Sequence, residues 1–238
     1  MTSTRLPGKV MLPLSGKPAL ERMIERIRPS RYVDDIVIAS PVGGAQEPIV
    51  ELAKNCGVKI FQGSEEDVLG RVLGAVRSVS GDIIVELTGD CPLLDHRLID
   101  EGLEEYFNSG ADYAANNTIP PITFPNGFDV QVFSVKALEE VGRLTIDPID
   151  RLHVSLYIYR HPERFKLHRW SAGPEVFGPD LRLTMDEDKD YELISAVFQR
   201  LLPNNPDFST SDVVRLIREN PELAQINESV RQKEIHEE

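Results

Sequence analysis

The chain has 238 residues and a formal net charge of −13, with 26 Lys and Arg against 39 Asp and Glu. This charge argues against a nucleic-acid polymer as partner, because binding one requires many cationic contacts to phosphates. No apolar run approaches membrane-spanning length, the first residues lack the pattern of a signal peptide, and two cysteines are too few for a disulfide framework, so we expect a cytoplasmic protein with no membrane partner.

A basic segment opens the chain. Residues 1–31 carry a balance of +5, which leaves −18 on the remainder. Residues 3–9 are, in order, Ser3, Thr4, Arg5, Leu6, Pro7, Gly8 and Lys9. Backbone N–H groups and two cations in one short turn are what a nucleotide triphosphate requires. We therefore expect this loop to bind a small phosphorylated ligand, with an ordinary solvated turn as the alternative.

The rest of the chain alternates short apolar runs with amphipathic stretches, which is typical of an α/β sheet covered by helices. The predicted strands are residues 35–39, 58–61, 82–88, 111–115, 128–133, 165–170 and 181–185. Helical spacing predicts helices over residues 68–76, from about residue 96, over 154–159 and over 191–201. Ser64 with Asp67 is typical of a capping box before the first of these helices.

Two aspartates follow predicted strands. Asp90 lies in a Gly/Pro turn after one strand, and Asp186 directly follows another. Ligands of open α/β sheets bind beside the carboxyl ends of strands, and Mg²⁺ is typically held by one or two carboxylates plus substrate phosphates. We therefore predict that Asp90 and Asp186 bind Mg²⁺, with a turn-forming role as the alternative for Asp90. Asp188 and Asp190 are assigned to the start of the next helix.

Several other polar residues admit two interpretations. Arg71 lies near the nucleotide, or it forms an i,i+4 ion pair with Asp67. His153 is a candidate general base, with a structural role as the alternative. Asp129 and Gln131 fall on one face of a predicted strand and either bind sugar hydroxyls or satisfy a turn.

Taken in order, seven motifs resemble the cytidylyltransferases that make CMP-activated sugar acids, and most closely their spore-coat polysaccharide biosynthesis branch. The motifs are STRLPGK (3–9), GKP (16–18), GSEEDVL (63–69), TGDCPL (88–93), GFDV (127–130), DRLHV (150–154) and LTMD (183–186). The resemblance implies a three-layer, Rossmann-like nucleotide-diphospho-sugar transferase fold with a mixed, mostly parallel sheet. It also implies that a sugar hydroxyl attacks the α-phosphate of CTP, that pyrophosphate leaves, and that Mg²⁺ is the cofactor.

The resemblance also carries residue roles. The expected catalytic residues are Lys9, Asp90 and Asp186, and of these Asp90 and Asp186 are expected to bind the metal. The nucleotide is expected to contact the loop at residues 3–9 together with Arg71 and Thr88. The sugar acid is expected to contact Asp129, Gln131, Arg151 and His153.

The resemblance extends to organisation, with two departures. One cytidylyltransferase-like domain is expected over residues 1–238, and residues 118–173 are the candidate arm of a homodimer. The family usually begins with a strand ending in Gln-Ala-Arg, which would precede Met1, so we expect a longer natural protein. Gly70 stands where the family commonly has an aspartate, which weakens the assignment of Arg71.

Two other functions remain open. The stretch Asp186-Glu187-Asp188 could be the metal motif of a glycosyltransferase of the related nucleotide-sugar fold. Such an enzyme would not need the triphosphate loop around Arg5 and Lys9. The second alternative is an inactive homologue that lacks its first strand.

Overall fold

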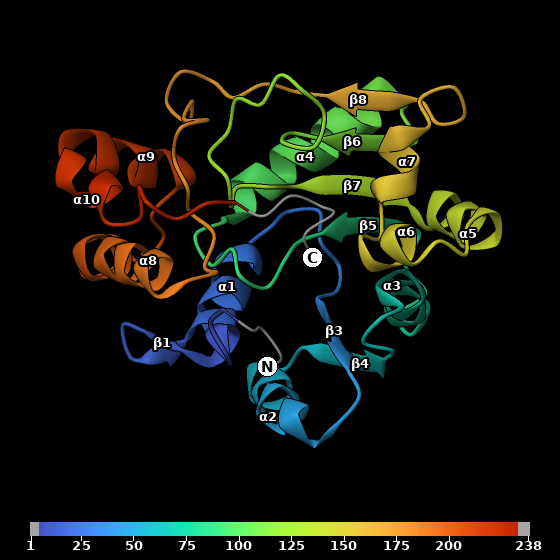
Figure 1. The fold of residues 1–238 in the computed structure, drawn as a ribbon, viewed down its shortest axis with the longest axis horizontal. Helices are drawn as coiled ribbons and strands as arrows, with labels where there is room; N and C mark the ends of the chain where they lie inside the picture. Colours follow the sequence, from blue (N-terminus) through green and yellow to red (C-terminus); the bar gives the residue numbers. More distant parts are fainter. Residues whose placement is uncertain (1–4, 233–238) are drawn as a thin grey trace.

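The computed structural model describes residues 5–232 (Figure 1). The two predicted nucleotide ligands Ser3 and Thr4 lie outside the described residues. Within that part of the chain, no helix is long and apolar enough to cross a bilayer.

A four-stranded mixed sheet forms the centre of the fold. Its strand order is β5 (Ile83–Glu86), β7 (Gln131–Ser134), β6 (Tyr113–Ala115) and β8 (Leu167–Arg169). Strand β7 runs antiparallel to both neighbours and β6 runs parallel to β8, so three strands point one way and β7 alone is reversed. The predicted α/β class with a mixed sheet is confirmed.

Two smaller strand pairs accompany this sheet. Strand β3 (Val37–Pro41) pairs in parallel with β4 (Lys59–Gly63), and β1 (Pro13–Leu14) pairs antiparallel with β2 (Lys17–Pro18). Across residues 5–232, no hydrogen-bonded ladder joins β3 to β5.

Helices cover both faces of the central sheet. The α-helices are α1 (Ala19–Ile27), α2 (Glu47–Cys56), α3 (Val68–Arg77), α4 (His96–Ser109), α5 (Val135–Leu144), α6 (Pro148–Leu152), α7 (Leu156–Arg160), α8 (Asp188–Leu201), α9 (Thr210–Glu219) and α10 (Pro221–Gln225). Short 3₁₀ turns, η1 (Lys9–Met11) and η2 (Gly44–Gln46), precede β1 and α2.

Successive side chains of β7 point to opposite faces of the sheet, so they pack into two different cores. Val132 packs into a core with Leu98 of α4 and with the helices α8 and α9. Its neighbour Phe133 faces the other way, into a core with Leu69 of α3 and Leu138 of α5. The two helix layers on either side of the sheet are visible in Figure 1. The expected three-layer arrangement therefore holds around this sheet.

One predicted strand is wrong. Residues 181–185 form no strand; they contact residue 126 through a single isolated bridge between Asn126 and Arg182. Asn126 N donates to Leu181 O at 3.0 Å and Leu183 N donates to Asn126 O at 2.6 Å. The pairing stops there because Gly127, with φ of 101°, turns the segment after Asn126 away from residues 181–185.

The predicted capping box also needs correction. Asp67 itself is the N-cap of α3, and its carboxylate accepts from Gly70 N at 2.9 Å. Ser64 Oγ accepts from Asp67 N at 3.0 Å and so fixes the turn before the cap. Helix α3 starts at the residue after Asp67, because the Asp67 carboxylate alone accepts from the otherwise unpaired N–H three residues later and so caps the helix.

Candidate active site

Lys9 and two aspartates form the centre of the site. Lys9 Nζ lies 2.5 Å from Asp90 Oδ2 and 2.7 Å from Asp186 Oδ1. The structure therefore brings together the two strand-end carboxylates that the sequence singles out, although only Asp90 follows a true strand. Met185 N donates to Asp90 O at 2.9 Å and ties the two turns to each other.

The loop before Lys9 determines where its ammonium lies. Gly8 adopts a left-handed conformation with φ of 69°, and η1 begins at the next residue. Leu6 is buried at 7% exposure and anchors the loop in the core, while Pro7 is exposed. An apolar anchor, a left-handed glycine and a helical turn together direct Lys9 towards the carboxylates.

The charges stabilise one another. Burial disfavours the ionised form of Asp186, but hydrogen bonds and charge from Lys9 and Arg182 outweigh it and hold the pKa of this carboxyl below its usual range. Burial likewise opposes the charge on Lys9, but Asp90 and Asp186 overcome it and raise the pKa of Lys9. Lys9 and Asp186 are therefore both ionised near neutral pH.

Two arginines hold the second oxygen of Asp186. Arg182 Nη2 donates to Asp186 Oδ2 at 2.7 Å, and Arg5 Nη2 lies 3.4 Å from the same atom. Arg5 Nη1 also lies 3.4 Å from Glu187 Oε1. Arg5 is predicted from the sequence as a site residue, whereas Arg182 is not. The only signal for Arg182 in the sequence is its place four residues before the aspartate.

Asp190 and Asp188 have the helix-start roles predicted for them. Asp190 is fully buried and takes part in a capping box with Glu187 at the start of α8. Asp188 is exposed in the first turn of that helix. The structure therefore places both residues at the start of α8, as the sequence predicts.

The two carboxylates fit a divalent cation. Each directs one oxygen at a single cationic atom, Lys9 Nζ, so the same point suits a metal ion. In the described part of the chain, no cluster of three or more His, Cys, Asp or Glu side chains could hold a metal. Mg²⁺ accepts one or two carboxylates when substrate phosphates complete its shell, and Asp90 with Asp186 meets that requirement.

The two residues predicted to contact the nucleoside lie in different settings. Thr88 is exposed, and its Oγ1 lies 3.2 Å from Cys91 Sγ in the turn that leads to Asp90. Arg71 donates to the carbonyl oxygen of Ser64, and burial lowers its pKa. Its expected i,i+4 partner, Asp67, bonds Arg151 instead.

The four residues predicted to contact the sugar fall into two groups. Asp129 Oδ2 accepts from Gly127 N at 2.8 Å, so it satisfies a turn, and burial raises its pKa. Gln131 Oε1 accepts from Tyr113 and Ser155 hydroxyls at 2.5 and 2.6 Å, beside the end of β5.

The other group lies at α6. Arg151 donates to Asp67 Oδ2 at 2.7 Å and lines a cavity of ≈ 350 Å³ with Arg77 and Arg143. His153 is half-buried at the end of this helix. Glu139 also lines this cavity and accepts from Arg77, so the guanidinium groups there already face one carboxylate.

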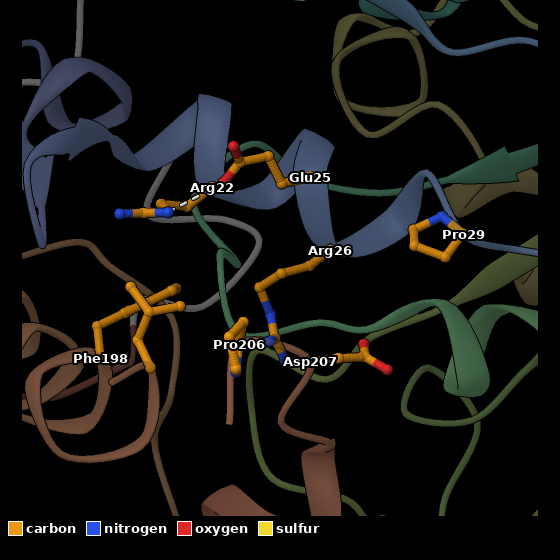
Figure 2. Close-up of a pocket in the computed structure, with 8 residues that line it drawn as sticks. Arg22, Glu25, Arg26, Pro29, Phe198, Pro206 and Asp207 are labelled. Atoms are coloured by element: carbon orange, nitrogen blue, oxygen red, sulfur yellow. Dashed lines mark hydrogen bonds and ion pairs between the residues drawn. The ribbon is translucent and has the colours of Figure 1, made fainter. Parts of the chain in front are cut away.

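A second cavity, of ≈ 200 Å³, has a separate set of lining residues (Figure 2). Its lining includes Arg26, which is 7% exposed and stacks 3.8 Å from the ring centroid of Phe208. Arg26 donates to the carbonyl oxygens of Leu93 and Leu94, each at 3.0 Å, and burial lowers its pKa to about 10. Arg26 therefore supports the segment that follows Asp90 and does not contact the site.

The chain is similar to known cytidylyltransferases. The cytidylyltransferase family model matches residues 1–205. The chain is 32% identical to the spore coat polysaccharide biosynthesis protein SpsF of Bacillus subtilis, over 94% of this chain and 93% of that protein. It is 25% identical to a 3-deoxy-manno-octulosonate cytidylyltransferase of Chloroherpeton thalassium, over 68% and 71% of the two chains.

A solved structure shows the same fold. The cytidylyltransferase of Leptospira borgpetersenii superposes with a TM-score of 0.88 at 32% identity, over 98% of this chain and 95% of that one. The family model and these similarities cover the segments that carry Lys9, Asp90 and Asp186. The chain therefore belongs to the cytidylyltransferase family and is a CTP-dependent nucleotidyltransferase.

Proposed function

We propose that the chain transfers CMP from CTP to a sugar acid in the cytoplasm, for the biosynthesis of a cell-surface polysaccharide. The observation that carries the proposal is the convergence of Asp90 and Asp186 on one cationic point beside the Arg5–Lys9 loop. The similarity to a 3-deoxy-manno-octulosonate cytidylyltransferase and to a polysaccharide biosynthesis protein supports the acceptor class.

The reaction is an in-line displacement at the α-phosphorus of CTP. The acceptor hydroxyl oxygen forms a bond to that phosphorus, the bond to the bridging oxygen of the β-phosphate breaks, and pyrophosphate leaves with the electron pair. The hydroxyl proton passes to water or a nearby base. Catalysis of such a transfer comes mainly from positioning and from neutralising charge on the phosphates.

Different residues of the site would bind the metal, the triphosphate and the acceptor. Asp90 and Asp186 would hold Mg²⁺, which when bound supplies positive charge to the phosphoryl oxygens. Lys9 and Arg5 would contact the triphosphate, because they are the two cations of the loop that face the carboxylates. Arg151, beside the guanidinium-lined cavity, is our candidate for binding the acceptor's carboxylate.

The test is a panel assay of pyrophosphate release. The purified protein is incubated with Mg²⁺, each of the four nucleoside triphosphates and a set of sugar acids. We expect release with CTP that depends on a sugar acid and does not occur with the matching neutral sugars. Release from no combination, together with tight CTP binding, would favour an inactive homologue. Cleavage of a nucleotide sugar in a separate incubation would favour a glycosyltransferase.

A further inference from the structure

Arg182 occupies the second oxygen of the metal-binding aspartate. Its Nη2 donates to Asp186 Oδ2 at 2.7 Å, while Oδ1 of that carboxylate faces Lys9 Nζ. One oxygen of Asp186 is therefore directed to the cation position. The other is hydrogen-bonded to Arg182, with Arg5 Nη2 at the longer distance of 3.4 Å. The Arg182 and Asp186 side chains are each 11% exposed, so little water reaches this pair.

The Arg182 guanidinium is also held by Asp190 and Gln232. Its Nε donates to Asp190 Oδ1 at 2.9 Å and its Nη2 lies 3.1 Å from Asp190 Oδ2, while Nη1 donates to Gln232. Asp190 is 0% exposed and also accepts from the backbone N–H groups of Asp186 and Glu187, both at 3.0 Å. Each nitrogen of the guanidinium thus has a carboxylate or amide partner.

The C-terminal part of the chain closes this network. Asn227 is 4% exposed, and its Nδ2 donates to Asp190 Oδ1 at 2.9 Å and to the carbonyl oxygen of Arg182 at 3.0 Å. A side chain held at both its backbone and its guanidinium cannot swing away without leaving buried charges unpaired. Arg182 is therefore a rigid block at Asp186 Oδ2.

We propose that Arg182 determines the metal specificity of this site: by blocking Oδ2 of Asp186 it limits that carboxylate to one oxygen ligand, which favours Mg²⁺ and Mn²⁺ over Ca²⁺. The inference rests on the proposed function, because it takes Asp186 as a metal ligand. Ca²⁺ takes six to eight oxygens, often through bidentate carboxylates, whereas Mg²⁺ requires a compact octahedron and keeps water ligands. A carboxylate with one available oxygen suits the smaller ion.

Removing Arg182 alone would leave Asp190 as an unpaired buried charge. The informative variant is therefore R182M/D190N, which deletes the cation and the buried carboxylate charge together. R218M is the matched control, because Arg218 forms a two-contact ion pair with Asp180 at 2.6 and 2.7 Å on the surface. Circular dichroism establishes that each variant is folded.

The measurement is the ratio of Ca²⁺ to Mn²⁺ affinity with CTP present. Protein-bound Mn²⁺ is followed by water-proton relaxation while Ca²⁺ displaces it, which requires no turnover. We expect R182M/D190N to raise the Ca²⁺ to Mn²⁺ affinity ratio about tenfold, as for other changes behind a metal ligand, and R218M to leave it unchanged.

An unchanged ratio in the folded double variant would overturn the inference while leaving the proposed function intact. Mn²⁺ binding with the expected ratio change but no pyrophosphate release from any sugar acid would contradict the proposed reaction alone. A wild-type protein that binds no Mn²⁺ in the presence of CTP would contradict both.

Discussion

Lys9 has two roles that conflict in the protein without ligand. Its ammonium lies between Asp90 and Asp186, at the point that suits a divalent cation. It is also the cation of the loop that the proposed function assigns to the triphosphate. Metal and nucleotide would therefore bind together, because the arriving phosphates draw Lys9 away from the carboxylates that the metal needs.

Replacement of Lys9 separates these two roles. In K9M the two aspartates lose the ammonium that competes with a metal, so we expect Mn²⁺ without CTP to bind about fivefold more tightly than in the wild type. The same variant should bind CTP more weakly and release pyrophosphate at least about 100-fold more slowly. Mn²⁺ titration followed by water-proton relaxation, with pyrophosphate release, measures both effects.

The matched control for this variant is K17M. Lys17 pairs with Glu21 and Glu25 on the surface, so its loss should change neither quantity. Weaker Mn²⁺ binding by K9M in the absence of CTP would show that Lys9 does not compete for the metal position.

A site residue is predictable from the sequence when a chemically suitable residue type stands at a recognisable local position, such as a strand end or a turn. Asp90 and Asp186 stand after apolar runs, and Lys9 ends a Gly/Pro turn, so each has a local signal. Arg182 has only its place four residues before Asp186 as a signal, because the bond between them depends on a turn whose path is set by Gly127 and Asn227 from distant parts of the chain.

At the scale of elements, β5 connects the core to the site. Its early residues pack between the helix layers, its last residue is Glu86, and the turn to Asp90 follows. Glu86 Oε2 is buried with no hydrogen-bond partner among residues 5–232, and burial raises the pKa of this carboxyl to about 8. The strand thus ends in an acid that is protonated below that pH.

Glu86 makes the stability of the fold depend on pH. Because its folded pKa lies above the usual value of a glutamate, its contribution is complete below about pH 4.5 and is lost as the pH rises through about 8. We expect the free energy of unfolding of the wild type, relative to E86Q, to fall by on the order of a few kcal/mol between pH 5 and 9.

Urea unfolding at several pH values measures this difference. D82N is the control, because Asp82 is exposed directly before the same strand and its replacement should leave the pH profile as it is. Parallel profiles for wild type and E86Q would mean that Glu86 is ionised in the folded protein throughout.

Elements with a strong period are predicted well, and those that depend on distant partners are not. The strands β3 to β8 and the helices α3, α4 and α8 follow from apolar spacing in the sequence. Residues 181–185 have the same apolar spacing but lack a partner beyond Asn126, so no strand forms. Alternation of apolar residues predicts which side chains are buried. Whether the segment pairs as a strand depends on the partners that the rest of the chain supplies.

At the scale of the whole molecule, residues 118–173 supply more than an arm. They contain β7, β8 and the helices α5 to α7, and so form much of the sheet and one helix layer. The same stretch exposes four large apolar side chains: Ile146 at 93%, Ile122 and Leu144 at 39% each, and Leu152 at 37%. Its role in dimer formation remains a prediction.

We expect the protein to be a homodimer in solution that uses this stretch. Light scattering coupled to gel filtration should give twice the chain mass of 26.7 kDa for the wild type. I146E should shift the mass towards one chain, because a charge at a buried apolar contact is costly. F107E is the control, since Phe107 is exposed at 60% outside residues 118–173. A monomeric wild type would exclude the dimer.

The central claim is that Asp90, with Asp186, holds the metal for CMP transfer from CTP, and D90N tests it most directly. Pyrophosphate release from CTP and the sugar acid found active in the panel assay is compared for wild type, D90N and D188N. We predict at least about a 100-fold loss of release for D90N with the fold retained, and near wild-type release for D188N, whose side chain is exposed on α8. Wild-type release by folded D90N would contradict the account.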